Sequence, residues 1–471
     1  MNLDRLFRLS DNNTTFRTEI VAGLTTFLTM SYIIFVQPAV LSGQMFGFET
    51  GLDFGAVMVA TCLSAALATL IMALYARYPI ALAPGMGQNF FLVFTVLPAA
   101  AAAGITNSWQ VALGIIFISG VLFLILTLIG IREKILDAVS PSMRNAIAVG
   151  IGLFIAFIGL QNTGFIIKDP GTAVTLNPDF HSPDILIFFI VFLFTAILHA
   201  RGVRGSILLG ILAATGISIL WYTLIPYLPD EIGGSEVVTE SMLMKDFVIA
   251  ESIVSSPPSI EPTFFKMDIV GALALSMIPF ILIFLFMDVF DTMGTIIGVS
   301  ERAGFIKDNK LPRAKNAMMA DSVGTVAGAA FGTSTVTSYI ESAAGVEQGG
   351  RTGLTGVVVA VLFLLALFFS PVISMVASYP PITAPALVIV GSMMIQNVNK
   401  IDWGDYSESI PSFLIIIGIP LTYSIADGLA LGFISYPVVK YASGKGKEVK
   451  VLMYVLAVIL LVYFLLVRSG M

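Results

Sequence analysis

Charged residues are scarce in this chain. Asp, Glu, Lys and Arg make up 11% of its 471 residues, whereas hydrophobic residues make up 57%. A soluble domain has about 25% charged residues, so this composition excludes one and predicts a polytopic membrane protein. The net charge of −6 does not identify a partner by itself. We expect the lipid bilayer to surround the chain, and no nucleic acid to bind it.

Cysteine and histidine are almost absent. The single cysteine, Cys62, lies in an apolar run, which excludes a disulfide framework. His181 and His199 form no HExxH motif and no metal-binding cluster, so we expect no metal and no cofactor. The polar N-terminus, residues 1–19, has no apolar segment directly after its basic residues. We therefore expect no cleavable signal peptide.

Long apolar runs are abundant. Several are shorter than the roughly 20 residues that a simple membrane-spanning helix needs. Two of them, 81–94 and 332–345, mix glycine with polar residues. Broken helices at corresponding places in two halves of a transporter mark its binding site near the middle of the membrane. The apolar stretches lie at about 20–41, 54–76, 80–97, 109–130, 141–161, 184–200, 204–227, 269–299, 316–331, 333–347, 352–376, 380–397, 410–425, 427–442 and 451–468.

The longest polar loop, about 228–267, divides the chain into residues 1–227 and 268–442, with seven stretches in each half. Seven is an odd number of crossings, so the second half is predicted to be inverted relative to the first. The segment 443–471 contains a basic loop and one extra apolar run that suits a fifteenth span or a helix lying against the bundle. The internal matches that favour an inverted repeat pair 140–162 with 380–397 and 198–211 with 423–434.

Basic residues fall on one side of the membrane if every stretch crosses once. The positive-inside rule then places that side, and the N-terminus, in the cytoplasm. We expect a multi-pass protein of the cell (inner) membrane. The basic residues on this side include Arg8, Arg17, Arg77, Arg144, Arg201, Arg204, Arg302, Arg313 and Lys440.

Asp291 lies near the middle of the longest strongly apolar stretch, 269–300. A carboxylate at this depth costs several kcal/mol unless it is partnered, neutralised or lines a wet cavity, so it is a candidate functional residue. Asp288, three residues earlier, lies near the same helical face. The alternative is that Asp291 satisfies backbone amides or pairs with a basic residue.

Glu341 lies in the polar break 332–345, after a run of small and β-branched residues, Thr333–Ser338, that favours a strand. A helix that begins near Ser338 would present unpaired backbone N–H groups and favour negative charge there. The alternative role for Glu341 is a cap of its own helix. In the first half, PGMGQN (84–89) is the corresponding candidate, with Asn89 as a donor and acceptor and Phe90 as a stacking face.

Two further acids lie within or at the ends of apolar runs. Asp321 is close in sequence to Arg313 and Lys315, and Asp427 lies at a predicted turn. We expect a helix cap or an interhelical pair for both. The small residues of 324–332 indicate close helix packing.

Several motifs resemble the adenine/guanine/hypoxanthine permeases, the purine branch of the nucleobase:cation symporter-2 family. The resemblance covers about residues 5–445. It implies an all-α polytopic protein of the uracil-permease type, with fourteen spans in two inverted repeats of seven and a short strand plus a half-helix in spans 3 and 10. The motifs are GLTTFLTMSYIIFVQP (23–38), APGMGQN (83–89), FDTMGTIIGV (290–299), GTSTVTSYIESAAGVEQGGRTGLT (332–355) and ADGLALGFISY (426–436).

The resemblance also implies a division into two domains. A core domain would comprise about 20–130 plus 268–376, and a gate domain about 140–227 plus 380–442. Relatives dimerise through the gate domain, so a homodimer is expected.

By resemblance, Asp291 is the eighth-span acid and Glu341 the tenth-span acid that bind the base, and Asn89 is the third-span amide. The chain departs from the usual pattern at Gln88 and at Phe90, which replaces a small residue and would narrow the pocket. This departure leaves the substrate preference open.

The function implied is import of purine bases by proton symport, with the core domain moving against the gate domain. Carboxylates accept from the ring and exocyclic N–H groups of a purine. We expect Asp291, Glu341, Asn89, Phe90 and Ser338 to bind the base, and Asp291, Glu341 and Asp288 to serve proton coupling. The alternatives are a sodium-coupled permease, a uracil or xanthine permease, and an anion exchanger or channel on the same fold. An intramembrane enzyme is a further alternative class, but this chain has no Ser/His pair and no metal-binding pair at bilayer depth.

Overall fold

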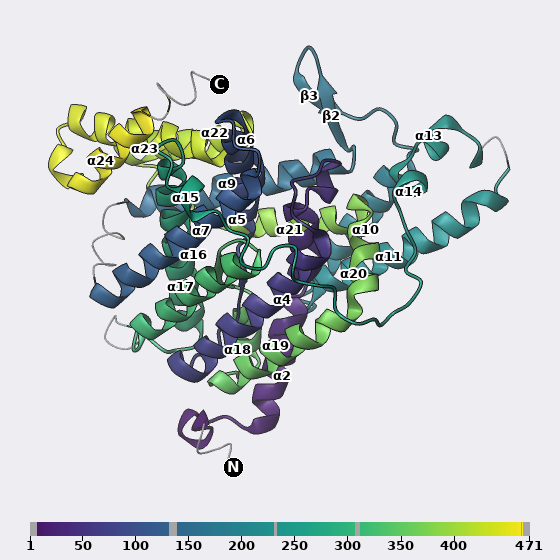
Figure 1. Ribbon diagram of the computed structural model, residues 1–471, viewed down its shortest axis with the longest axis horizontal. Coiled ribbons are helices and arrows are strands. Elements are labelled where there is room, and N and C mark those ends of the chain that lie inside the picture. The colour runs from purple at the N-terminus through teal and green to yellow at the C-terminus, as the bar shows by residue number, and fades with distance from the viewer. Residues whose placement is uncertain (1–6, 131–138, 230–232, 307–310, 463, 465–471) are drawn as a thin grey trace.

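The computed structural model describes residues 7–130, 139–229, 233–306, 311–462 and 464. The protein is a helical bundle (Figure 1), and within the described residues nine helices are long and apolar enough to cross a membrane. This number is smaller than the predicted fourteen for two reasons. Some predicted spans are broken or short, and α17 and α23 are helical but less apolar, since each carries a buried aspartate and a lysine.

The first half contains a strand-and-helix element between α4 and α7 and a hairpin, β2–β3, between α9 and α10. Its elements are η1 (Ser10–Asn12), α2 (Phe16–Met30), α3 (Ile33–Leu41), η2 (Gln44–Phe46), α4 (Phe54–Ile71), η3 (Met72–Ala76), β1 (Leu82–Pro84), α5 (Met86–Phe91), η4 (Leu92–Val96), α6 (Leu97–Ala102), α7 (Ser108–Ile129), α9 (Pro141–Asn162), β2 (Ile166–Asp169), β3 (Ala173–Leu176), α10 (Pro183–Ala200), α11 (Ser206–Leu224) and η5 (Ile225–Tyr227).

The second half contains a corresponding strand-and-helix element between α17 and α19. Its elements, with the two short helices of the preceding loop, are α13 (Glu236–Thr239), α14 (Met242–Lys245), α15 (Ile269–Ala272), α16 (Ile278–Arg302), α17 (Ala314–Phe331), β4 (Val336–Ser338), α18 (Ser342–Glu347), α19 (Gly353–Ala366), η6 (Leu367–Phe369), α20 (Ser370–Ala377), α21 (Pro380–Ile395), η7 (Gln396–Lys400), α22 (Tyr406–Thr422), α23 (Ile425–Ala442), η8 (Gly446–Glu448) and α24 (Val451–Val462). Part of the predicted run 451–468, residues 463 and 465–468, lies outside the described residues.

Short polar side chains begin several of the long helices. Thr15, Asp53 and Ser140 each accept a hydrogen bond from a backbone N–H three residues later, at the starts of α2, α4 and α9. Such N-caps satisfy one of the free donors of a helix end. The apolar runs that follow therefore become helices with defined first turns.

Strands β1 and β4 pair inside the bundle, although they are far apart in sequence. They pair antiparallel, with Leu82 opposite Ser338 and Pro84 opposite Val336. Each strand is followed by a six-residue helix, α5 or α18. All residues of both strands are buried, so the two broken segments bring their polar residues together inside the bundle.

The predicted helix start near Ser338 is wrong. Helix α18 begins at Ser342, and Glu341 is its N-cap. Strand-like hydrogen bonding continues beyond the expected start, because the N–H of Ser338 donates to Asp321 and the N–H of Tyr339 donates to the carbonyl of Ala81, at 2.9 Å. The strand β4 therefore ends at Ser338, and a turn at Ile340 and Glu341 leads into α18.

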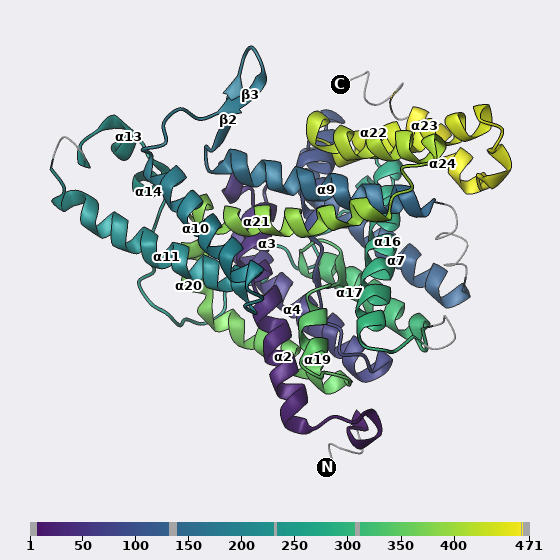
Figure 2. The same cartoon turned by 180° about the vertical axis from the view of Figure 1, so that it is seen from behind.

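Two groups of helices surround the paired strands β1 and β4. Helices α2, α4, α7, α16, α17 and α19 pack on one another, and α9 packs against α21 and α22. Figures 1 and 2 both show α9 and α21 lying side by side, with α22, α23 and α24 beyond them. The assignment of these groups to a mobile core and a gate stays a prediction.

The small residues of α17 permit close packing, as predicted. A Cβ added at Gly324 would lie 2.7 Å from Cβ of Ala68, and one at Gly328 would lie 2.8 Å from the carbonyl of Ser334. A larger side chain at either position would push α17 away from α4 or from the segment before β4. Close approach therefore fixes the helix that carries Asp321.

The segment between the two halves contacts several helices. Asp184, at the start of α10, accepts hydrogen bonds from the backbone N–H groups of Met242 and Leu243, at 2.9 and 3.0 Å. Further along, the hydroxyls of Ser255 and Ser370 lie 2.8 Å apart, and Thr263 donates to the carbonyl of Phe331. The described part of this loop thus lies fixed along the bundle.

Candidate functional site

Helix α16 places two aspartates beside the paired strands β1 and β4, in different surroundings. Asp288 is 1% exposed, whereas Asp291 is exposed at the surface of the fold. Residues three apart on a helix point in directions that differ by about 60°, so one faces the packed interior and the other an accessible face. Among the described residues, no ion pair joins Asp291 to a lysine or an arginine.

Gln88 supplies the side-chain contact of Asp291. Its Nε2 lies 3.4 Å from Oδ2 of Asp291 and donates to it. Gln88 is 2% exposed and lies in the first turn of α5, directly after β1. The departure from the family pattern at this position therefore lies against Asp291.

Glu341 is half-buried at the start of α18. Its Oε1 accepts a hydrogen bond of 2.9 Å from the hydroxyl of Tyr32, and its carbonyl lies 3.4 Å from the hydroxyl of Thr29. Tyr32 was not among the predicted site residues, although the motif 23–38 contained it. The partner of Glu341 thus comes from the turn between α2 and α3.

The side chain of Asn89 is engaged by the protein. Its amide exchanges hydrogen bonds with the amide of Gln37, and Ser334 donates to its Oδ1. Gln37 also donates to Thr333, at 2.9 Å. Asn89 is completely buried, so in this conformation it joins α5 to α3 and to the segment before β4.

Asp321 enters the site from α17, and the structure corrects its predicted surroundings. It accepts hydrogen bonds from the hydroxyl of Thr292, at 2.5 Å, and from the backbone N–H of Ser338, at 3.0 Å. No ion pair with Arg313 or Lys315 occurs among the described residues. The expected interhelical contact is present, but neutral donors of α16 and β4 make it.

Asp288 and Asp321 are each only partly satisfied. The Oδ2 of Asp288 accepts from the hydroxyl of Thr325, at 2.9 Å. The Oδ1 atoms of both aspartates are buried and have no hydrogen-bond partner. Ser338, predicted to bind the substrate, is 3% exposed and donates from both its N–H and its hydroxyl to Asp321.

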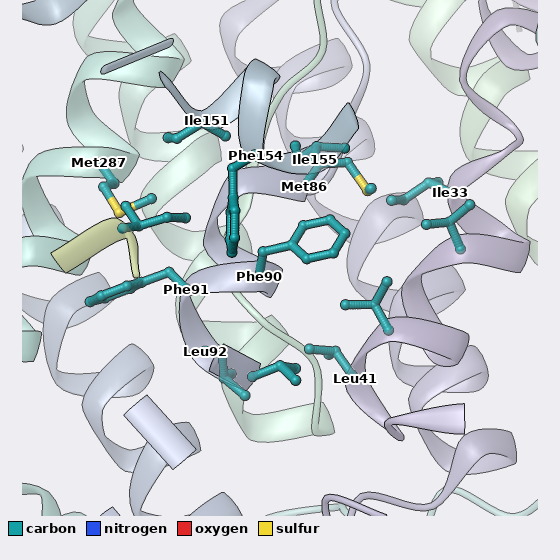
Figure 3. Packing of buried hydrophobic residues seen from close by; sticks show 14 of the residues in the cluster. Ile33, Leu41, Met86, Phe90, Phe91, Leu92, Ile151, Phe154, Ile155 and Met287 are labelled. Atoms are coloured by element: carbon teal, nitrogen blue, oxygen red, sulfur yellow. The ribbon is translucent and has the colours of Figure 1, made fainter. Parts of the chain in front are cut away.

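The ring of Phe90 packs among other aromatic rings. It is completely buried, stacks on Phe94 with ring centroids 6.2 Å apart, and meets Phe154 edge-on. Figure 3 shows it between α9 and α3, beside Phe154, Ile155 and Met86. In this conformation neither face of Phe90 is open, so a stacking role would require a rearrangement.

Asp427 lies in the first turn of α23, at the predicted turn. Its backbone N–H donates to the hydroxyl of Ser424, the N-cap of this helix. It is 4% exposed and lies on a different helix group from Asp291 and Glu341.

Comparisons with known proteins give the same family as the motifs. Residues 17–431 match the model of the family described as "Permease family". The chain is 48% identical to a putative permease of Methanocaldococcus jannaschii, over 98% of both chains. It is 42% identical to the guanine/hypoxanthine permease PbuG of Bacillus subtilis (98% of this chain, 99% of that protein) and 38% identical to the adenine permease AdeQ of Escherichia coli (99% and 96%).

Solved structures share the fold at low sequence identity. The transmembrane domain of the cyanobacterial bicarbonate transporter BicA has a TM-score of 0.58 and 15% identity, over 89% of this chain and 97% of that chain. The structure of SLC26A9 has a TM-score of 0.60 and 11% identity, over 94% of this chain and 68% of that chain. Identity this low shows the fold alone. With the family match and the full-length relatives, it follows that this chain belongs to the permease family, in its nucleobase:cation symporter-2 group, and is a transporter rather than an enzyme.

Proposed function

We propose that the protein imports a purine base, adenine, guanine or hypoxanthine, by proton symport. The observation that carries this proposal is a pair of accessible carboxylates beside the paired strands β1 and β4. Glu341 precedes α18, after β4, and Asp291 of α16 contacts Gln88 of α5, after β1. The names of the full-length relatives, guanine/hypoxanthine and adenine permeases, support the same substrate class.

The chemistry of the site suits a planar base with several N–H groups. The two carboxylates accept from ring and exocyclic N–H donors, and hydrogen bonds to charged acceptors are the strong ones. The amide of Gln88 and the hydroxyl of Tyr32 already contact these carboxylates. A bound base would therefore form hydrogen bonds with groups that are already positioned.

The proton would reside on the acid that the protein holds less firmly. Glu341 has a hydrogen bond of 2.9 Å to Tyr32, whereas Asp291 has only a 3.4 Å contact with Gln88. We assign the base anchor to Glu341 and the coupling proton to Asp291, with Asp288 one turn away as a second acceptor. Transfer of an ionised carboxylate from water to a site without a cation is costly, which links protonation to closure around the base.

Alternating access would be a movement of α16 and its neighbours against α9 and α23. The surfaces between them are apolar and include Ile147, Phe286, Leu429 and Phe433, which line a small cavity. Apolar contacts are non-directional, so such surfaces slide more easily than hydrogen-bonded ones. The fourteen-span inverted repeat, the core and gate domains and a homodimer through the gate belong to this proposal.

The proposal is tested by uptake into proteoliposomes. Labelled adenine, guanine, hypoxanthine and uracil are each offered with an inward proton gradient, with a sodium gradient and with neither. We expect accumulation of at least one purine that follows the proton gradient. Accumulation of uracil alone would reject a purine as the substrate. Dependence on the sodium gradient alone would reject the proton as the coupling ion.

Binding by Glu341 is tested with a matched control in the same helix. Glu341→Gln should weaken purine binding at least about tenfold, since a hydrogen bond to a charged group contributes about 1.5–3 kcal/mol. Glu347→Gln should bind normally, because Glu347 is exposed and forms a surface ion pair with Arg302. Equal binding by the two variants, measured by isothermal titration, would make Glu341 a helix cap only.

An anion exchanger on the same fold is the second candidate, because two of the similar solved structures are of a bicarbonate transporter and an anion transporter. Two accessible carboxylates in the site oppose an anionic substrate by like-charge repulsion. Bicarbonate and sulfate uptake in the same vesicles distinguishes the two, and we expect none.

A further inference from the structure

A cavity lined by three arginines lies away from the paired strands β1 and β4. Its volume is about 320 Å³, within the range of about 300–1,000 Å³ typical of small-molecule sites. We call it the arginine pocket. Its lining residues are Phe7, Arg8, Asp11, Asn12, Arg77, Arg313 and Thr352.

The arginines come from three separate segments. Arg8 precedes η1, Arg77 ends the π-helical turn η3 after α4, and Arg313 is the N-cap of α17. All three have positive φ, at 52°, 57° and 60°. Non-glycine residues adopt this conformation at some energetic cost and cluster at functional sites. The chain therefore gathers guanidinium groups at three turns that the fold holds together.

The pocket carries an excess of positive charge. Three arginines line it, and Asp11 is the one acidic residue of the lining. Within the described part of the chain, no ion pair involves Arg8, Arg77 or Arg313. Their charges are therefore available to an anion from outside.

Arg313 is held in place by an aromatic ring. Its guanidinium lies 4.7 Å from the ring centroid of Tyr78, a distance typical of a cation–π contact. Tyr78 is 1% exposed, and its hydroxyl donates to the carbonyl of Pro312. A buried ring thus fixes one of the three arginines before any ligand binds.

We propose that the arginine pocket binds a phosphate group. Arginine forks match the oxygen atoms of a phosphate and bind it through paired hydrogen bonds. The predicted orientation places the pocket at the cytoplasmic face, where both phospholipid headgroups and soluble phosphate esters are available. Either source supplies the same group. The pocket is formed by the N-terminal segment and the ends of α4, α17 and α19, so its occupation is separate from purine binding.

The test uses the purified full-length protein in nanodiscs. In one arm, nanodiscs of phosphatidylcholine receive inorganic phosphate or, at equal ionic strength, sodium chloride. In the other arm, phosphatidylglycerol replaces part of the phosphatidylcholine. Thermal unfolding is measured for the parent, Arg77→Gln and Arg313→Gln, and for Arg204→Gln as a matched control, since Arg204 is exposed on the same predicted side and does not line the pocket.

We expect phosphate or phosphatidylglycerol to raise the melting temperature of the parent and of Arg204→Gln. In the pocket variants the half-saturating concentration of phosphate or phosphatidylglycerol should rise at least about tenfold, because each variant loses one guanidinium group. A response to phosphate alone identifies a soluble ligand, and a response to phosphatidylglycerol alone identifies a headgroup.

Equal responses of pocket and control variants in both arms would overturn the proposal and leave the arginines as determinants of orientation only. If a glutamine variant does not fold, Arg77→Lys replaces it, because lysine keeps the charge but loses the paired hydrogen bonds of the guanidinium group. Its phosphate binding should be weaker than that of the parent and stronger than that of a glutamine variant. Purine binding is measured on the same samples and should be unchanged. This separates a failure here from a failure of the transport proposal.

Discussion

Neighbouring side chains give the two accessible acids different properties. Glu341 is held by the hydroxyl of Tyr32, while Asp291 has a long contact with an amide. A firmly hydrogen-bonded carboxylate is positioned to orient a ligand, and a weakly held one changes its protonation state with less disruption. The surroundings therefore support an anchor and a proton carrier rather than two equivalent acids.

Gln37 is a residue whose importance is visible only through its partners. Gln37→Met should lower the free energy of unfolding by about 1–3 kcal/mol, because Asn89 and Thr333 lose a buried partner. Chemical unfolding monitored by tryptophan fluorescence measures this change. Gln44→Met is the control, since Gln44 is exposed, and it should change little. Similar losses in both variants would contradict the role of the buried amide pair.

At the scale of elements, α9 and α21 cross at a pair of glycines. A Cβ at Gly152 would lie 2.8 Å from the carbonyl of Gly391, and a Cβ at Gly391 would lie 2.9 Å from Cβ of Ala156. Gly391→Val should therefore destabilise the protein by about 1–3 kcal/mol through overpacking. Gly216→Val, in α11, has no atom within 4 Å of the added Cβ and controls for the change in helix propensity.

The thermal unfolding of these two valine variants in detergent gives the comparison. We expect a lower melting temperature for Gly391→Val than for Gly216→Val. The same melting temperature for both would mean that α9 and α21 separate without cost.

The start of α22 carries an ionic cluster outside the apolar part of the helix. The pKa of the Asp405 carboxyl lies below its usual value, chiefly because Lys445 donates to it at 2.7 Å and also because Ser407 donates to it. A lowered pKa in the folded state adds stability above the unfolded pKa of about 3.9, and this stability is lost as the pH falls towards the lower folded value.

Asp405→Asn should therefore lower the melting temperature by an amount that is constant between about pH 8 and pH 5 and that shrinks below about pH 4. Asparagine is also an N-cap, so the comparison isolates the charge. Melting curves across this pH range measure the effect. A difference that grew on acidification would have the wrong sign for a lowered pKa.

The orientation of the whole molecule is open to a direct test, because Cys62 is the single cysteine and is completely buried. In a Cys62→Ala background, Thr172→Cys lies in the exposed β2–β3 turn and Lys447→Cys in η8 near the other end of the chain. An impermeant thiol reagent should label Thr172→Cys in intact cells, and Lys447→Cys only after the membrane is opened. The reverse pattern would place the N-terminus outside.

Much of the molecule follows from the sequence alone. Low charge and long apolar runs predict a membrane bundle because lipid excludes unsatisfied polar groups. Local glycine and polar residues at 81–94 and 332–345 predict the two breaks, and an unpaired carboxylate in an apolar run marks Asp291. These features depend on neighbours in sequence, so no tertiary contact is needed to read them.

Other features were decided by tertiary contacts alone. Gln37 and Thr333 are separated by 296 positions, yet they share a hydrogen bond beside Asn89. Asp321 has basic neighbours in sequence, but α17 turns it towards Ser338 and Thr292. Composition and local pattern are enough to identify the polar groups that the membrane makes costly. Only the packing of segments that are distant along the chain shows which of these groups satisfy one another and which stay accessible.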